Sequence, residues 1–394
     1  MNSLTKPKIN TEEIKNSGPK AVEISANGNG NPAISLLKKW LKKMPFAMAL
    51  DFYRRRFLDS PTFDSTIEPM ANILEDWPRV LVIDNTNSCN AKCVWCPNPD
   101  LTNLGVMKMD VFRHIMDDYS SRGGHIRFGT FGEPMLDKTL GEKIEYLRRF
   151  SSITGAEVLT NGYFLTEKIT SILLDNSIGV EVSLDELDKE TFEDVKKMSY
   201  DVVKDNILAF LEANDKAPKP VPVNFRVKTL KTYEETVNHE LYKRMSDHNC
   251  SIELTPIDDN IIANWAGKFD KDSFFENYLG GTPSSTKFSY KQFNLTNKAP
   301  CVQLWKWLVI YWDASAVLCC VDMFSTTRLG NLKDKSIKEI WTGSVMSKMR
   351  EKMRDRKRFD IPICQDCDIH LSWHNLKEYY DKSGKILPNR RFIS

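Results

Sequence analysis

Between residues 79 and 257 the chain alternates short apolar runs with longer stretches in which apolar residues recur every three to four positions. The first pattern is typical of a buried strand and the second of an amphipathic helix. The apolar runs predict six strands, at residues 79–84, 125–130, 156–159, 179–184, 221–228 and 251–257. The intervening stretches predict helices, such as the one marked by Val111, Phe112, Ile115, Met116 and Tyr119.

This order of elements predicts the fold class. Consecutive parallel strands need a crossover connection, which is usually a helix, so six β–α units in a row predict a parallel α/β sheet. We expect the sheet to curl into a partial (β/α)6 barrel of the TIM type. Its functional groups should then lie on the loops that follow each strand. A doubly wound open sheet is the alternative that the pattern leaves open.

Three segments flank the predicted barrel, which spans residues 79–265. Residues 1–78 begin polar and turn helical and basic between residues 34 and 58. We expect an N-terminal extension, disordered and then helical, that packs on the main domain; a membrane-surface or partner helix is the alternative. Residues 266–300 are polar and predict a linker with some helical turn. Residues 301–394 predict a small, separate α+β domain.

Charge and composition narrow the class of protein. The chain has 55 Lys and Arg against 53 Asp and Glu, a net charge of +2, so we expect no nucleic acid partner. No run of 18 apolar residues predicts a transmembrane segment, and the first residues lack the apolar core of a secretory signal. We therefore expect a cytoplasmic protein, whose nine cysteines are not a set of disulfides.

Three of these cysteines, Cys89, Cys93 and Cys96, fall within eight residues directly after the first predicted strand. A structural zinc site takes four ligands, and this loop supplies three. Three thiolates can instead bind three irons of a [4Fe–4S] cluster and leave the fourth iron open to an outside chelator. Zinc with a remote fourth ligand remains the alternative.

The motif Cys89-x-x-x-Cys93-x-x-Cys96, with Trp95 before its last cysteine, resembles the signature of the radical S-adenosylmethionine (SAM) enzymes. The resemblance covers about residues 79–265. It implies that SAM binds the open iron and that reduction releases a 5′-deoxyadenosyl radical. It also implies SAM contacts after successive strands. These are Gly132, Glu133 and Pro134 for the amino group, Asn161 for the methionine moiety, Ser183 and Asp185 for the ribose, and Arg226 or Lys228 for the carboxylate.

A second group of cysteines lies in the C-terminal segment, at Cys301, Cys319, Cys320, Cys364 and Cys367. Its spacing resembles the auxiliary-cluster domain called SPASM, or twitch in its one-cluster form. The resemblance implies that Cys301, Cys319, Cys364 and Cys367 ligate one further [4Fe–4S] cluster. Cys320 could take the place of Cys319, because adjacent residues on a strand point to opposite faces. A zinc ribbon with four cysteines is the alternative.

A closed auxiliary cluster favours a redox role. By resemblance to aminocyclitol dehydrogenases, we expect oxidation of a small sugar or aminocyclitol carbinol. Asp322 is the candidate base, its alternative being a structural hydrogen bond, and a flavodoxin- or ferredoxin-type protein is the expected reductant. Other readings are a radical epimerase in which Cys320 returns the hydrogen, a peptide- or protein-modifying maturase, and a non-catalytic iron–sulfur or zinc-binding protein.

Overall fold

The computed structural model describes residues 61–257, 262–279, 300–367, 380 and 383–386. Its strands form one sheet in the order β6-β5-β4-β3-β2-β1-β7-β8-β9. The first six are parallel: β1 (Val80–Ile83), β2 (Gly124–Phe128), β3 (Ile153–Thr160), β4 (Gly179–Ser183), β5 (Val223–Thr229) and β6 (Ser251–Pro256). Strands β6 and β9 are the two edges of the described sheet, so the barrel is partial, as predicted.

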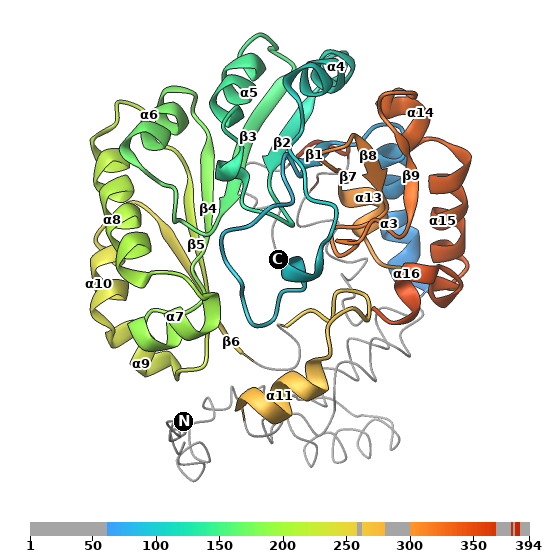
Figure 1. Ribbon diagram of the computed structural model, residues 1–394. Helices are drawn as coiled ribbons and strands as arrows, with labels where there is room; N and C mark the ends of the chain where they lie inside the picture. Colours follow the sequence, from blue (N-terminus) through green and yellow to red (C-terminus); the bar gives the residue numbers. More distant parts are fainter. Residues whose placement is uncertain (1–60, 258–261, 280–299, 368–379, 381–382, 387–394) are drawn as a thin grey trace, which may run out of the picture. The chain divides into compact units, whose positions relative to one another are not determined.

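Helices cover the outer face of the curved sheet (Figure 1). They are α4 (Met109–Tyr119), α5 (Leu140–Leu147), α6 (Glu167–Asp175), α7 (Lys189–Lys196), α8 (Tyr200–Lys216), α9 (Tyr233–Asn238) and α10 (Glu240–Ser246). The sequence predicted one helix where α9 and α10 stand. His239 separates them because its backbone is extended and its ring accepts a hydrogen bond from Leu241 N.

The C-terminal cysteine group lies in a region that shares the barrel's sheet. Strand β7 (Leu308–Ile310) pairs in parallel with β1, and β8 (Ser315–Val317) and β9 (Arg328–Asn331) continue the sheet antiparallel. Around them lie α13 (Gln303–Lys306), α14 (Ile337–Trp341), α15 (Ser344–Arg354), η5 (Arg358–Asp360) and α16 (Pro362–Gln365). The predicted linker contributes α11 (Lys271–Leu279). The C-terminal domain is thus joined to the barrel by strand pairing.

Helix α3 (Pro61–Leu74) comes from the predicted N-terminal extension and packs on the C-terminal region. The indole of Trp341 donates to Leu74 O at 2.9 Å, and Arg354 pairs with Glu75 at 2.7 Å. This helix therefore packs on the C-terminal region, whereas the packing of the rest of the extension stays a prediction. The basic helices predicted at residues 34–58 lie outside the described residues.

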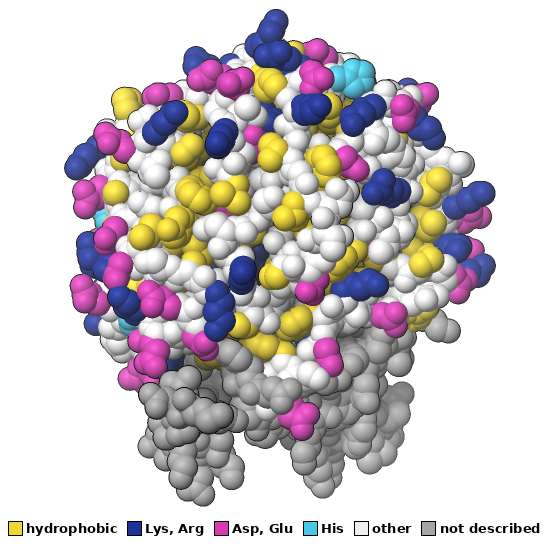
Figure 2. Space-filling model, viewed as in Figure 1, with side chains coloured by type: hydrophobic (Ala, Val, Ile, Leu, Met, Phe, Trp, Pro, Cys, Tyr) yellow, Lys and Arg dark blue, Asp and Glu magenta, His cyan; other side chains and the backbone are white. Residues whose placement is uncertain are grey.

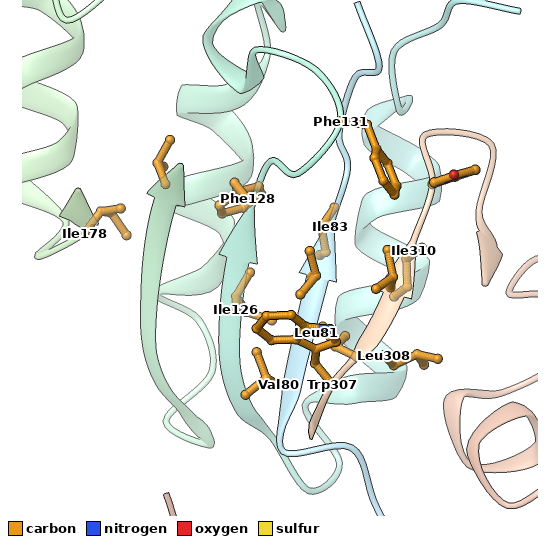
Figure 3. Close-up of a cluster of buried hydrophobic side chains, with 14 of the residues drawn as sticks. Val80, Leu81, Ile83, Ile126, Phe128, Phe131, Ile178, Trp307, Leu308 and Ile310 are labelled. Carbon is orange, nitrogen blue, oxygen red and sulfur yellow. The ribbon is translucent and has the colours of Figure 1, made fainter. Parts of the chain in front are cut away.

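Strand β1 runs through the centre of the hydrophobic core (Figure 3). Its residues Leu81 and Ile83 lie level with Leu308 and Ile310 of β7, and all four are fully buried. Burying a side chain of this size stabilises the fold by about 1.5–3 kcal/mol. The loop that follows β1, which carries the first cysteines, therefore starts from a firmly packed strand.

The charged side chains on the surface are of both signs, in agreement with the similar numbers of basic and acidic residues. Figure 2 shows basic and acidic side chains interspersed around the rim of this face, with hydrophobic side chains nearer its centre. The described part of this face has no uniformly basic patch of the kind that binds nucleic acid. Among the described helices, none is long and apolar enough to cross a membrane.

Candidate active site

The three cysteines of the first motif lie together beyond the carboxyl end of β1. Burial raises the pKa of the Cys89 thiol to about 12 and that of the Cys96 thiol to about 11, and it raises the pKa of Cys93 as well. Cys93 also acts on both of the other thiols, so the three sulfurs are close enough to interact electrostatically. Neutral thiols are thus favoured in the absence of a metal, whereas metal coordination deprotonates them.

Two kinds of metal site place different demands on such a loop. A zinc ion needs four ligand atoms within about 2.0–2.3 Å of one point, whereas the cysteines of a [4Fe–4S] cluster each ligate a different iron. Among the described residues, no three Cys, His, Asp or Glu side chains converge on a single ion. Three thiols on one loop fit a cube that keeps one iron for an outside ligand.

Helix α7 holds one side of the cysteine loop. Its last turn accepts two backbone hydrogen bonds, from Lys92 N to Lys196 O at 3.1 Å and from Val94 N to Val195 O at 3.0 Å. On the other side, Asn161 at the end of β3 donates to Asn90 Oδ1 at 2.8 Å and lies 4.0 Å from the sulfur of Cys89. The predicted position Asn161 is therefore beside the cysteines.

A second loop, residues 131–134 after β2, is locked onto the cysteine loop. The amide of Asn98, in η2 (Asn98–Asp100), donates to Asn87 O at 2.8 Å and to Phe131 O at 2.7 Å. Glu133 N donates to Ser88 O at 2.8 Å. The cysteines and the predicted SAM amino-group loop thus form one rigid unit.

Asp84, the residue after β1, supports the same unit. Its side chain is fully buried, and Oδ1 accepts from Phe131 N at 3.0 Å and Gly132 N at 3.4 Å. Burial raises the pKa of this carboxyl to about 7, although the backbone hydrogen bonds lower it. From the sequence, Asp84 was predicted only as the end of a strand. A carboxylate at the end of an apolar run was the signal that it is buried with a partner.

The predicted loop residues Gly132, Glu133 and Pro134 have different roles in the loop. Glu133 is buried, and its carboxylate accepts from Thr160 Oγ1 and Asn161 N, both at 2.8 Å. This side chain therefore ties the loop to the end of β3. Pro134 begins η3 (Pro134–Leu136), and its carbonyl accepts from Asn85. Glu133 and Pro134 are thus both held by contacts within the protein.

Replacing Gly132 by Ala should destabilise the folded protein by about 1–3 kcal/mol, because a Cβ would stand 2.3 Å from Thr86 O and 2.6 Å from Ser88 O. Urea unfolding of the metal-free protein measures this. Gly141→Ala in α5 is the control, since its Cβ would meet only the flexible end of Ile172 at 3.1 Å and Ala favours a helix. Equal stability of the two variants would contradict the close approach.

The predicted ribose positions Ser183 and Asp185 lie beside a buried lysine that the sequence analysis missed. Lys196 donates to Asp185 Oδ2 at 2.8 Å and to Ser183 O at 2.9 Å. Burial opposes ionisation, but the ammonium groups of Lys196 and Lys228 hold the pKa of Asp185 below its usual value. The charge of Lys196 also acts on the thiols of Cys93 and Cys89. Lys196 therefore connects the loop after β4 to the cysteines.

Replacing Lys196 by Met should lower the free energy of unfolding by about 3–5 kcal/mol, because it leaves the buried Asp185 carboxylate without its close partner. Urea unfolding of the metal-free protein is the measurement. Lys189→Met is the matched control, since its pair with Asp201 is about half exposed, at 55% and 49%, and its loss should change the stability far less. A loss at Lys196 no larger than at Lys189 would show that Lys228 suffices for Asp185.

Arg226 belongs to a set of ion pairs between neighbouring strands. Arg226 pairs with Glu181 at 3.4 Å, and Glu181 pairs with Arg127, which also holds Glu157 at 2.6 Å. These ion pairs join neighbouring strands where TIM barrels usually pack branched aliphatic side chains. Below them a cavity of about 1080 Å³, lined in part by Glu157 and Glu181, opens at the opposite end of the strands from the cysteine loop. Arg226 thus gains no support as a SAM carboxylate contact.

Lys228 and Trp95 lie together at the cysteine end. The ammonium of Lys228 is 5.7 Å from the Trp95 ring centroid and 3.9 Å from Asp185 Oδ1, and its charge acts on Cys93. Trp95 is buried and packs edge-on against Phe274 of α11. Lys228, the second cation proposed for the SAM carboxylate, is thus placed at the site.

The five auxiliary cysteines interact with one another. Cys319 interacts electrostatically with Cys367 and Cys301, and Cys364 interacts with the same two thiols. Cys320 hydrogen-bonds the thiol of Cys319, accepts a hydrogen bond from Gln303 Nε2 at 3.1 Å, and feels the charges of Lys306 and Arg127. The thiols of Cys301, Cys319, Cys364 and Cys367 therefore lie close enough to interact, and Cys320 lies beside Cys319.

Asp322 holds the turn that follows Cys319 and Cys320. It is buried, and its two carboxylate oxygens accept from Thr326 N, Thr326 Oγ1 and Thr327 N at 2.7–2.8 Å. These contacts are those of a structural carboxylate, the alternative that the sequence left open. The assignment of Asp322 as a base stays a prediction to which the geometry adds no support.

Comparisons with known proteins agree with this arrangement. Residues 85–239 match the model of the radical SAM superfamily, and residues 301–368 match that of SPASM, an iron–sulfur cluster-binding domain. The chain is 28% identical over 183 residues to a GTP 3′,8-cyclase of Desulforamulus reducens, covering 45% of this chain and 55% of that protein. It is 28% identical over 192 residues to a GTP 3′,8-cyclase of Thermodesulfovibrio yellowstonii, covering 47% and 58%. The chain thus spans little more than half the length of these relatives.

Solved structures share the fold. Streptococcus suis SuiB bound to its precursor peptide SuiA superposes with a TM-score of 0.53 at 14% identity, over 93% of this chain and 83% of that chain. BtrN in complex with AdoMet and 2-DOIA gives a TM-score of 0.47 at 19% identity, over 74% and 93%.

The partial barrel and its two cysteine sets define an iron–sulfur protein with two cluster sites. The chain contains a radical SAM domain over residues 85–239 and a SPASM domain over residues 301–368, as the resemblance of its motifs implied. These domains imply SAM, a [4Fe–4S] cluster with one open iron, and auxiliary iron–sulfur binding as its cofactor chemistry.

Proposed function

We propose that this protein oxidises a carbinol of a small sugar or aminocyclitol and passes the substrate's electron to an auxiliary cluster. The observation that carries this proposal is the group of four thiols, Cys301, Cys319, Cys364 and Cys367. Four protein ligands leave a [4Fe–4S] cluster no iron for substrate, which favours electron transfer. Strand β7 of the same region pairs with β1, so one sheet carries both cysteine sets.

When bound, SAM and the first cluster supply a 5′-deoxyadenosyl radical. The substrate carbon gives a hydrogen atom to this radical, its hydroxyl gives up a proton, and the remaining electron passes to the auxiliary cluster. The product is a carbonyl compound that is two hydrogens lighter. A reductant of the flavodoxin or ferredoxin class supplies the electron that starts turnover, and the electron leaving the substrate balances it.

The residues of the chain have positioning roles in this scheme. Cys89, Cys93 and Cys96 hold the first cluster, and Asp84 and Asn98 fix the neighbouring loop. The backbone at Gly132 and Pro134 is proposed for the SAM amino group. Asn161, Ser183 and Asp185 are proposed for the rest of SAM, and Lys228 for its carboxylate. Lys196 keeps Asp185 ionised and neutralises charge beside Cys93.

Epimerisation is the second candidate, and the position of Cys320 favours it. This thiol hydrogen-bonds that of Cys319 and feels the charge of Arg127, which belongs to the ion pairs inside the barrel. A thiol there could return a hydrogen atom to a substrate carbon.

Anaerobic reconstitution with SAM, a reductant and a panel of sugars, aminocyclitols and peptides tests these functions. The proposal requires a product two hydrogens lighter, formed with one 5′-deoxyadenosine per turnover. Unchanged mass with one deuterium taken from D2O would identify an epimerase, and a modified peptide would identify a maturase. Bound iron without any SAM cleavage under dithionite would leave the non-catalytic iron–sulfur reading, and zinc in place of iron would overturn all of these.

A further inference from the structure

Two buried cations stand beside the group of four thiols. Lys306, the last residue of α13, is fully buried, and Arg358, the first residue of η5, is 1% exposed. Buried charges are costly unless an opposite charge accompanies them. Both cations lie near cysteine thiols, which would be negatively charged when they bind a cluster.

Arg358 acts on the Cys-x-x-Cys pair. It hydrogen-bonds the sulfur of Cys364, and its Nη2 donates to Cys367 O at 2.8 Å. Burial and the neighbouring thiols raise the pKa of Cys364, while the charge and hydrogen bond of Arg358 oppose that rise. The guanidinium therefore stabilises negative charge on this sulfur.

Lys306 lies earlier in the sequence, between Cys301 and Cys319. Its ammonium lies 4.1 Å from the ring centroid of Trp307 and interacts with the thiols of Cys320 and Cys301. The charges of Arg127 and Arg226, from the barrel strands, also act on it. Burial lowers the pKa of Lys306 to about 7 and the two thiols raise it, so anionic sulfur nearby favours the charged form.

We propose that Lys306 and Arg358 tune the auxiliary cluster by raising its reduction potential, which makes it an acceptor for the substrate's electron. A [4Fe–4S] cluster with four thiolates carries net negative charge, and reduction adds one more in an interior of low dielectric. Buried cations and N–H···S hydrogen bonds offset that cost and favour the reduced state. This inference rests on the proposed function, because only an electron-accepting cluster needs a raised potential.

The test is a redox titration of the full-length holoprotein, followed by electron paramagnetic resonance, for Lys306→Met, Arg358→Met and the double variant. Signals are assigned with a Cys93→Ala variant, which keeps the auxiliary cluster. Each single variant should lower the auxiliary potential and the double variant should lower it further, while the first cluster serves as internal reference. Lys306→Arg and Arg358→Lys keep the charge and should stay near the wild-type potential.

Arg350→Met is the matched control. Arg350 is equally buried in the same domain, but it donates to the carbonyls of Leu304 and Trp341, and Glu75 and Arg354 are the charges that act on it. Its removal should leave both potentials unchanged. Met at position 306 has a similar length and removes the desolvation cost of a buried ammonium, and the iron content of the variant checks that it folds.

An auxiliary potential that is unchanged in Lys306→Met and in Arg358→Met, with iron content intact, would overturn the inference. If Arg358→Met loses iron, Lys306→Met decides alone. The titration contains no substrate, so its outcome is separate from that of the proposed function. If the variants lower the auxiliary potential but the protein forms no oxidised product, the tuning role stands and the proposed dehydrogenase activity is wrong.

Discussion

Replacing Cys93 by Ala should reduce SAM cleavage to the background rate and remove about half of the iron from the reconstituted protein. Cys93 is the central thiol of the first motif and interacts with both Cys89 and Cys96. Two remaining thiolates cannot hold a cluster that three protein ligands and SAM normally share, whereas the four distant thiols keep their own cluster. Iron analysis and 5′-deoxyadenosine formation under dithionite measure the two effects.

Cys250→Ala is the control for this experiment. Cys250 precedes β6, and its thiol donates to Met245 O at 3.2 Å beside the cavity at the opposite end of the barrel. It should keep full iron and full SAM cleavage. The cluster assignment would be wrong if Cys93→Ala retained all its iron, or if the intact protein bound zinc instead.

The six-unit barrel could be predicted from the sequence because each unit is a local pattern. A buried strand and the helix after it reveal their periodicity within about thirty residues. The pairing of β7 with β1 has no such local signal. Strand β7 is three residues long, and its partner lies far earlier in the chain. The sequence therefore predicted a separate C-terminal domain, whereas the two share one sheet.

The candidate site also contains residues that could be predicted from the sequence and residues that could not. The cysteines of the first motif could be found because one loop carries them all. Lys196 was missed because it looks like one of two adjacent surface lysines. Its signal was its position, since Phe192, Val195 and Lys196 continue one buried stripe of α7. A lysine on an apolar stripe indicates a buried partner, here Asp185.

Arg226 and Asp322 are site predictions to which the structure adds no support. Both were chosen because they lie near strand ends or cysteines in the sequence, and proximity in sequence does not give the direction of a side chain. Arg226 turns toward Glu181 within the barrel, and Asp322 turns into its own loop. Residues at strand ends have several polar neighbours, so their partners depend on contacts between distant segments.

Alanine at Cys319 should remove the auxiliary cluster, while alanine at the adjacent Cys320 should leave it in place. Cys319 interacts with Cys301 and Cys367, whereas Cys320 is hydrogen-bonded by Gln303 and by the thiol of Cys319. Iron content should therefore fall by about half in Cys319→Ala and stay unchanged in Cys320→Ala, since each cluster contains four irons. Both variants should still cleave SAM, because the first cysteine loop is intact in each.

The products of the two variants distinguish the candidate functions. For a dehydrogenase, Cys319→Ala removes the electron acceptor and should abolish the oxidised product, whereas Cys320→Ala should keep it. For an epimerase, Cys320→Ala removes the hydrogen donor, so SAM is consumed without inverted product. Loss of the auxiliary cluster from Cys320→Ala but not from Cys319→Ala would exchange the two assignments. Because the two residues are adjacent, each variant is the other's control for local disturbance of the fold.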